Sequence, residues 1–245
     1  MKTLLTMLAL LWASTSWAAS ITFDSFQTGE GTTGATYDNT IAADANIAVV
    51  CVAVRDSGGA VANVTSVEIE TVPATHLTRI SSGGVMQAEL WYLLSPPTGE
   101  NVTTVVASDA TTEFTVAGTL TFKGVAQTDT WNTPDSATSS GGSTTLYVDG
   151  IPSAVGEMAV LCPAIRTETT TATPEGTAPV STEVYENPHA TVGSMVGAAY
   201  YEAGDTTSIN MRVTLAPSVQ WAAVAASMRP LVSTRRPHSP IYLGQ

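Results

Sequence analysis

The chain has 245 residues, two of them cysteines, and carries 21 acidic against 9 basic side chains, a formal net charge of −12. This balance argues against a nucleic-acid-binding protein, because contacts to phosphate need clusters of Lys and Arg. Two cysteines rule out a miniprotein held by several disulfides. A chain with 44% hydrophobic and 12% charged residues can form a buried core, which argues against a disordered protein.

The first residues have the pattern of a secretory signal peptide, which we place at residues 1–18. Lys2 gives a positive start, the apolar segment Leu4–Trp12 is shorter than the roughly 20 residues that span a bilayer, and Ser16-Trp17-Ala18 fits the small-x-small cleavage pattern. We therefore expect a secreted protein, cut after Ala18 or Ala19. The alternative is an apolar segment that stays attached as a membrane tether or packing arm. We predict no other membrane-spanning segment.

Residues 19–231 have the pattern of a single all-β domain. Helical periodicity is almost absent, and short segments rich in β-branched residues are separated by Gly, Pro, Asn, Asp and Ser, as is typical of an antiparallel β-sandwich. Strands are expected, in chain order, at Ile21–Gln27, Ile47–Val54, Ser66–Val72, Met86–Leu94, Val102–Ala107, Phe114–Phe122, Met158–Ile165, Val180–Tyr185, Val196–Glu202, Ile209–Ala216 and Gln220–Met228.

Two of these segments indicate how the layers are arranged. Phe114–Phe122 presents one apolar face, whereas Ile47–Val54 is apolar on both faces, so we expect a central strand that is covered on both sides. Between the strands, Pro96–Gly99 is typical of a hairpin turn. Asn132–Ser143 is typical of a polar loop that links two halves, and Thr167–Gly176 of a second polar loop.

An internal repeat is the most informative pattern in the sequence. The segment Asn46–Arg55 aligns without gaps with Glu157–Arg166, which places Cys51 opposite Cys162. About forty residues later, Leu90-Trp91-Tyr92 matches Ala199-Tyr200-Tyr201. We therefore predict that residues 46–125 and 157–230 are two copies of one unit, which pack as a pseudo-twofold antiparallel β-sandwich with a jelly-roll-like topology.

Cys51 and Cys162 occupy equivalent positions of this repeat, and equivalent strands can lie close together near a pseudo-twofold axis. A secreted protein would allow the two thiols to oxidise to a disulfide. The alternative is two buried free thiols that act as small apolar side chains. Pro163 predicts an edge or bulged strand at that position, because proline cannot donate a ladder hydrogen bond.

No motif in the sequence points to catalysis. The three histidines His76, His189 and His238 are isolated, without a zinc-binding spacing, and are interpreted as surface or turn residues. Ser194 lacks the Gly-x-Ser-x-Gly elbow of a serine hydrolase. We expect no catalytic, metal-binding or cofactor-binding residues, and no cofactor.

The acidic residues fall mostly in predicted turns, where we interpret them as solvated side chains. Calcium could still bind such loops through carboxylates and carbonyls, although no EF-hand spacing is present. The turn acids considered are Asp56, Asp109, Glu113 and Asp205.

A few clustered aromatic residues are the candidates for glycan binding. Neighbouring residues of a strand face opposite sides, so one ring of each adjacent pair would point outward. Outward rings on a β-sheet could stack on sugars, whereas the alternative is ordinary packing in the core and at its rim. The candidate rings are those of Trp91, Tyr92, Trp131, Tyr200 and Tyr201.

The last residues, 232–245, differ in composition from the rest of the chain. They are basic at Arg235 and Arg236, contain two prolines, and end with the apolar residues Ile241, Tyr242 and Leu243. We interpret them either as a disordered end or as an arm that docks on an acidic neighbouring subunit. The arm interpretation predicts a homo-oligomer or an assembly with other surface proteins.

Several segments together resemble a known type of module. They are Glu89-Leu-Trp-Tyr-Leu93, Pro96-Pro97-x-Gly99, the segment from Phe122 to Thr128, and the final strand from Trp221 to Met228. Over residues 46–231 the chain is similar to a β-sandwich module of bacterial secreted proteins and bacteriophage structural proteins. The shared motifs are core strands and turns, and they bring no catalytic residues with them.

The resemblance implies a non-enzymatic module on the outside of a cell or virion. Our first expectation is therefore a structural or assembly protein that self-associates through its faces and its arm. The alternatives are a secreted glycan- or receptor-binding module and, last, a secreted hydrolase on a β-sandwich scaffold.

Overall fold

The computed structural model describes residues 20–56, 63–107, 113–166, 171–175, 182–188, 196–203 and 207–232. The regular structure in these ranges is entirely β-strand, and they contain no helix long and apolar enough to cross a membrane. The proposed leader and Arg235, Arg236, Ile241, Tyr242 and Leu243 of the proposed arm lie outside them. The strands are β1 (Thr22–Gly31), β2 (Gly34–Ile41), β3 (Ile47–Asp56), β4 (Val64–Ile69), β5 (Val72–Pro73), β6 (Thr75–Ser82), β7 (Met86–Leu94), β8 (Gly99–Ala107), β9 (Glu113–Lys123), β10 (Asp135–Pro152), β11 (Met158–Ile165), β12 (Thr171–Glu175), β13 (Thr182–Pro188), β14 (Val196–Ala203) and β15 (Ser208–Met228).

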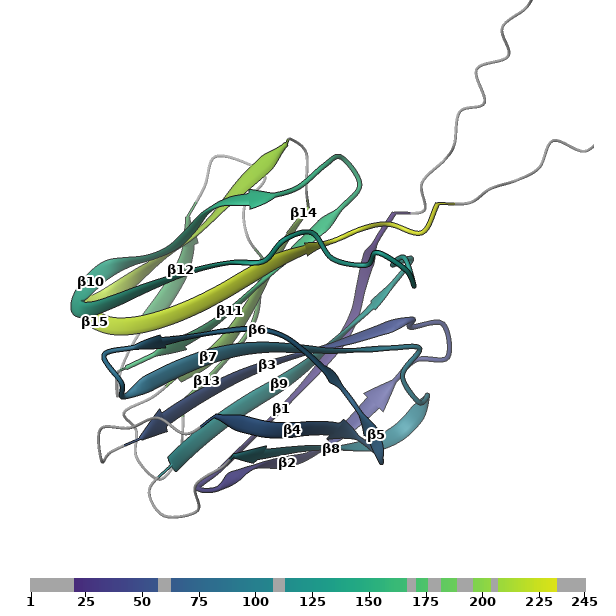
Figure 1. Ribbon diagram of the computed structural model, residues 1–245, viewed down its shortest axis with the longest axis horizontal. Helices are drawn as coiled ribbons and strands as arrows, with labels where there is room; N and C mark the ends of the chain where they lie inside the picture. Colours follow the sequence, from purple (N-terminus) through teal and green to yellow (C-terminus); the bar gives the residue numbers. More distant parts are fainter. Residues whose placement is uncertain are drawn as a thin grey trace, which may run out of the picture.

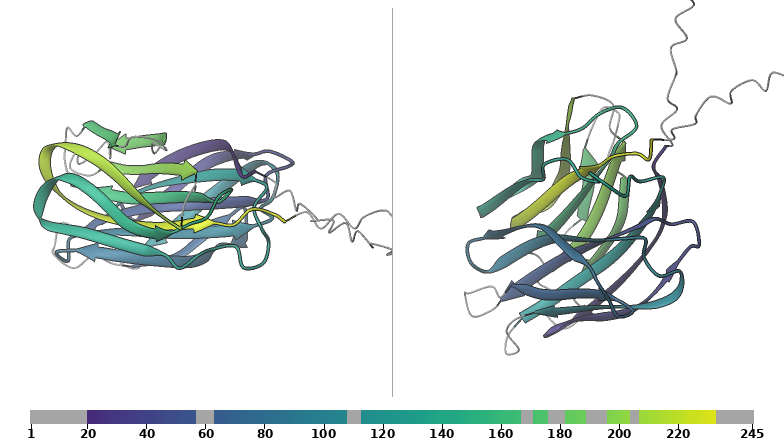
Figure 2. Two further views of the ribbon diagram at one scale, coloured as in Figure 1. Left: turned by 90° about the horizontal axis from the view of Figure 1, so that it is seen from above. Right: turned by 45° about the vertical axis from the view of Figure 1, so that its right-hand side comes forward.

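These strands form three antiparallel sheets that lie on top of one another (Figure 1). The outer sheet has the order β2-β8-β4-β5, and the central sheet has the order β1-β9-β3-β7-β6. The third sheet, which we call the folded sheet, has the order β10-β15-β11-β14-β13, with β12 also paired to β15. Figure 2 shows the same layers from two further directions. The predicted all-β antiparallel sandwich is confirmed, and it has more layers than a single sandwich.

The central strand predicted at Ile47–Val54 is confirmed. It is β3, it pairs with β9 and β7, and every residue of the predicted range is buried. Alternate side chains pack on opposite sides, because successive residues of a strand point to opposite faces. Val49 and Cys51 face the folded sheet, whereas Val50 and Val52 face the outer sheet.

The folded sheet covers part of itself because two of its strands are long and curved. β10 has 18 residues and β15 has 21, and the pairing between them shifts register around Ser139–Ser143 and again at Val148–Ile151. Met211 in the first part of β15 and Trp221 in its second part therefore meet in one buried cluster. In Figure 1 this curved pair lies uppermost.

Several predicted loops and strand ends differ from the structure. The loop predicted at Asn132–Ser143 was wrong, because β10 begins at Asp135 and pairs with β15. The loop predicted at Thr167–Gly176 contains β12. In both places cross-strand pairing outweighs the turn preference of Ser, Thr and Gly.

The turn predicted at Pro96–Gly99 is not a hairpin, because β7 and β8 belong to different sheets. Pro163 lies in β11 between β14 and β15, so the predicted edge strand was wrong. The alternative of a bulged strand was also wrong, because the pairing of β11 keeps its register on both sides. Pro163 pairs with Ala223 of β15, whereas Cys162 and Pro163 are left out of the pairing with β14.

Strand pairing follows the same order in the two halves of the chain. β3 lies between β7 and β9, and β11 lies between β14 and the second part of β15. On the other side of β7, β6 is the next paired strand, and β13 is likewise the next paired strand beside β14. The outer layers also correspond, because β8 pairs with β2 and β4, while the first part of β15 pairs with β10 and β12.

Candidate functional site

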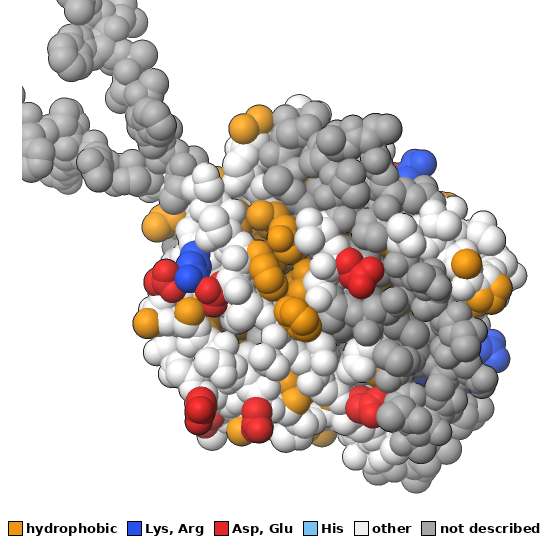
Figure 3. Space-filling view, turned by 180° about the vertical axis from the view of Figure 1, so that it is seen from behind, with side chains coloured by type: hydrophobic (Ala, Val, Ile, Leu, Met, Phe, Trp, Pro, Cys, Tyr) orange, Lys and Arg blue, Asp and Glu red, His pale blue; other side chains and the backbone are white. Residues whose placement is uncertain are grey.

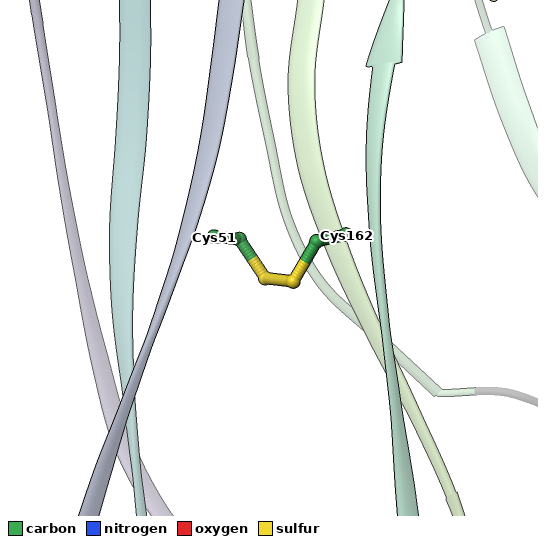
Figure 4. The surroundings of a disulfide bond; sticks show 2 residues. All are labelled: Cys51 and Cys162. Atoms are coloured by element: carbon green, nitrogen blue, oxygen red, sulfur yellow. A yellow bond between two sulfur atoms is a disulfide. The ribbon is translucent and has the colours of Figure 1, made fainter. Parts of the chain in front are cut away.

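The two cysteines meet in the layer between the central sheet and the folded sheet. Cys51 of β3 and Cys162 of β11 form a disulfide, with Cα atoms 5.1 Å apart (Figure 4). Both residues are at most 2% exposed and belong to the same apolar cluster as Val49 and Val160. The bond joins positions 111 residues apart in the sequence, and the free-thiol interpretation does not describe this pair.

The aromatic candidates for glycan binding are placed mainly in packing contacts. Trp91 is 7% exposed in the cluster between the central and outer sheets, so an outward ring was wrong for this residue. Tyr92 and Trp131 contact each other edge to face at 5.5 Å and pack against the core. Tyr201 stacks on Phe23 at 5.2 Å. The side chain of Tyr200 lies outside the described residues.

The face seen in Figure 3 carries a group of hydrophobic side chains near its middle, beside atoms that the structure does not describe. Phe26 of β1 is among the exposed hydrophobic residues, at 41%. Phe23, three residues earlier, contacts the rings of Phe122 and Tyr201. Phe23 of β1 therefore contacts an aromatic ring of the central sheet and one of the folded sheet.

The strongest chemical constellation is a buried carboxylate, Glu89 of β7. Its side chain is fully buried. One oxygen, Oε1, accepts hydrogen bonds from the backbone N–H of Val64 at 3.1 Å and from Nε2 of Gln87. The other, Oε2, accepts from Nε1 of Trp91 at 2.8 Å. Glu89 therefore ties the central sheet to β4 of the outer sheet.

His76 lies beside this carboxylate on the edge strand β6. Its Nε2 is 3.5 Å from Oε2 of Glu89, and its ring meets Trp91 at 4.8 Å. The side chain is 34% exposed, so the surface interpretation fits, but the residue lies in a strand rather than a turn. His189 and His238 lie outside the described residues.

Burial is the main influence on the protonation of His76. Loss of solvation lowers the pKa of His76 below its usual 6.5, the nearby carboxylate of Glu89 raises it, and the charge of Arg79 lowers it again. The imidazole is therefore neutral at neutral pH. A neutral imidazole beside a carboxylate is the arrangement of a general base, but both oxygens of Glu89 already accept hydrogen bonds from fixed, buried donors. The geometry is that of a cross-link between sheets.

The sequence carries a signal for this buried centre, although that signal is not a catalytic motif. Gln87, Glu89 and Trp91 alternate with the apolar residues Ala88 and Leu90, so they occupy one face of a strand that is otherwise apolar. A Glu in such a strand needs hydrogen-bond donors when it is buried. The sequence does not show which residues supply these donors.

The predicted solvated acids are only partly described. Asp56 ends β3 and is 7% exposed, so its interpretation as a solvated turn residue was wrong. Glu113 begins β9 rather than lying in a turn, and Asp109 and Asp205 lie outside the described residues. Within the described ranges, no three His, Cys, Asp or Glu side chains gather closely enough to hold a metal ion.

A polar hollow of about 440 Å³ lies on the outer sheet, and we call it the outer-sheet hollow. Its carboxylates come from three places: Asp38 on β2, Glu100 on β8, and Glu70 just after β4. Oε1 of Glu70 accepts a hydrogen bond from the backbone N–H of Val102 at 3.0 Å. The remaining lining residues are Asn39, Thr40, Asn101 and Val102.

Comparisons of the chain with protein-family models, with curated proteins and with solved structures gave no match.

Proposed function

We propose that this protein is a non-enzymatic structural component displayed outside a cell or on a virion, and that it self-associates. The observation that carries the proposal is the buried disulfide between Cys51 and Cys162, which joins the central sheet to the folded sheet within the core between them. Disulfides of this kind persist in oxidising compartments. A cross-link across 111 residues also restricts the unfolded chain strongly, which suits a body that must resist unfolding.

The use of the chemically interesting side chains supports a structural role. Glu89 is surrounded by donors from two sheets, and Trp91, Tyr92 and Trp131 pack within the protein. The alternative, a glycan-binding module, loses Trp91 as a stacking platform, because that ring is buried. The family resemblance to bacterial secreted and phage structural modules is part of this proposal.

We also infer that the two halves are copies of one unit. The support is the shared pairing order described above, together with the equivalent places of Cys51 and Cys162. In this interpretation the central sheet and the inner part of the folded sheet meet as two like subunits would, with a covalent bond at the centre of their contact.

The test of the proposed function is the mass of the purified protein in solution. Size-exclusion chromatography with light scattering, at several concentrations and without reductant, should give assemblies larger than one chain. Removal of residues 233–245 should reduce assembly and leave the thermal unfolding of the body unchanged. A protein that stays monomeric at every concentration would contradict self-association, and binding to sugars on a glycan array would favour the alternative.

A further inference from the structure

We propose that the outer face of the outer sheet binds the C-terminal arm of a second copy of this chain. The inference rests on the proposed self-association and names the surface that carries it. The outer sheet covers the central sheet with its inner face, through Tyr37, Val67 and Val105. In Figure 1 it forms the lowest layer, and no described element lies beyond it.

In the part of the chain that the structure describes, the strands of the outer sheet carry acidic side chains and no basic ones. Its strands carry Asp38, Glu68 and Glu100, and Glu70 follows β4, whereas the described residues of β2, β4, β5 and β8 include no Lys or Arg. Asp38 pairs with Val102 and Glu100 with Thr40, so the two carboxylates are diagonal neighbours across β2 and β8. Diagonal neighbours on one face remain within reach of long side chains, so a cationic partner could contact both carboxylates at once.

The same face carries an apolar strip along β8. Val102 is 38% exposed and Val106 is 42% exposed, while Asn101, Thr103 and Val105, which alternate with them, point inward and are buried. A partner for this face therefore needs positive charge near the start of β8 and an apolar group near its end. Glu100 and Val106 are six residues apart, or about 20 Å along a strand.

The C-terminal arm has these two features at the matching spacing. Arg235 and Arg236 are separated from the apolar group Ile241 to Leu243 by a short segment that contains Pro237 and Pro240. Arg236 and Tyr242 are also six residues apart. Two prolines favour an extended chain and remove two backbone donors, so the arm suits docking by side chains on a face better than pairing at a sheet edge.

The arm begins at a different place from the face that it would bind. Leu231 donates a backbone hydrogen bond to Gly124, and Pro230 pairs with Val125, both just after β9 of the central sheet. An arm that leaves one site and binds another site on the next copy gives a head-to-tail contact. Such a contact builds rings or filaments rather than closed pairs, and oppositely charged surfaces make it sensitive to salt.

The test compares the unmodified protein with a face variant and a matched control. The face variant Asp38→Asn/Glu100→Gln should need roughly tenfold more protein to assemble, as measured by light scattering. The control Asp129→Asn/Glu183→Gln removes two exposed charges away from the outer sheet and should assemble as the unmodified protein does. Sodium chloride at 1 M should weaken the unmodified protein's assembly.

A charge exchange gives the sharper result. Neither Asp38→Lys/Glu100→Lys nor Arg235→Glu/Arg236→Glu should assemble alone, and a mixture of the two should assemble. This inference is wrong if the unmodified protein assembles and the face variant assembles equally well. It is also wrong if the unmodified protein assembles and the mixture of the two charge-exchanged variants does not. In both cases the proposed function stands. Binding of the arm to its own chain, seen as protection of the arm in a monomer, also overturns it. If the unmodified protein never assembles, the proposed function fails first.

Discussion

The two halves of the chain reach the same strand pairing by different means. In the first half, the outer layer is a separate sheet, and strand structure is interrupted at residues 32–33 between β1 and β2. In the second half, β10 and β15 run unbroken through the bend, so one sheet supplies both layers. Layer order is therefore compatible with either broken or continuous strands.

The difference in connection is matched by a difference in side chains. The predicted alignment places Ala198 where the first half has Glu89, and Gly197 where it has Ala88. The first half ties its outer sheet to the central sheet through hydrogen bonds to Glu89. In the second half, β10 and β15 continue as strands from one layer into the other, so main-chain pairing between them runs through both layers.

The largest expected effect comes from the bond that joins the halves. Cys51→Ala/Cys162→Ala should lower the free energy of unfolding by about 4 kcal/mol, since the closed loop is long. Chemical denaturation without reductant measures this. Reduction of the unmodified protein in denaturant should give the same midpoint as the variant, and equal midpoints for oxidised protein and variant would contradict the expectation.

Glu89→Gln should have the next largest effect. The new amide replaces one of the two acceptor oxygens with an NH2 group. In one orientation this NH2 faces Trp91 Nε1, and in the other it faces Gln87 Nε2 and the N–H of Val64. Donor then faces donor in either orientation, so the loss should be about 2–3 kcal/mol. Urea unfolding measures the loss. Exposed Glu183→Gln in the second half is the control and should change stability by less than about 0.5 kcal/mol. A Glu89 variant as stable as this control would show that the cross-link is dispensable.

Gly197→Ala tests the close approach of the halves. A Cβ atom at Gly197 would lie 2.7 Å from Cγ1 of Val116 and 3.4 Å from Cβ of Ala53, both in the central sheet. We expect a loss of about 1–3 kcal/mol from overpacking, measured as a lower unfolding midpoint. Ala88→Gly at the equivalent position of the first half removes a methyl group instead of adding one. We expect it to lower the free energy of unfolding by only about 1 kcal/mol, and it serves as the comparison.

The smallest expected effect is the pH dependence at His76. Strand pairing places Glu183 at the corresponding position of the second half, because His76 pairs with Trp91 and Glu183 pairs with Tyr200. Because the folded state lowers the pKa of His76 below 6.5, the unfolded chain takes up the proton first. Stability is therefore full above the unfolded pKa and falls as the pH drops through about 6.5. His76→Gln should flatten this part of the curve between pH 8 and pH 5. A steeper curve in the variant would mean that attraction to Glu89 dominates over burial.

Much of the fold could be predicted from the sequence, because the pattern of apolar and polar side chains along a strand indicates which of its faces are buried. The apolar segment at β3 predicted a strand covered on both sides, since neither of its faces is polar enough for solvent. The segments at β7, β9 and β11 were found for a similar reason, and their bounds agree with the structure within two residues.

The strands that the sequence did not predict are rich in Thr, Ser and Gly. β2 and β6 are edge strands, and the first part of β10 contains Ser and Thr residues followed by two glycines. Such residues are equally common in loops, so their local preference does not distinguish the two states. Pairing with β8, β7 and β15 decides them.

The sequence by itself determined the fold class, the buried centre strand and the likeness between the two cysteine segments, because these depend on side-chain periodicity within one segment. Only the tertiary structure decided that the cysteines bond, that Trp91 is buried, and that Glu89 collects its donors from β7 and from the start of β4. These outcomes depend on which face meets which, and that is set by packing between residues far apart in the chain.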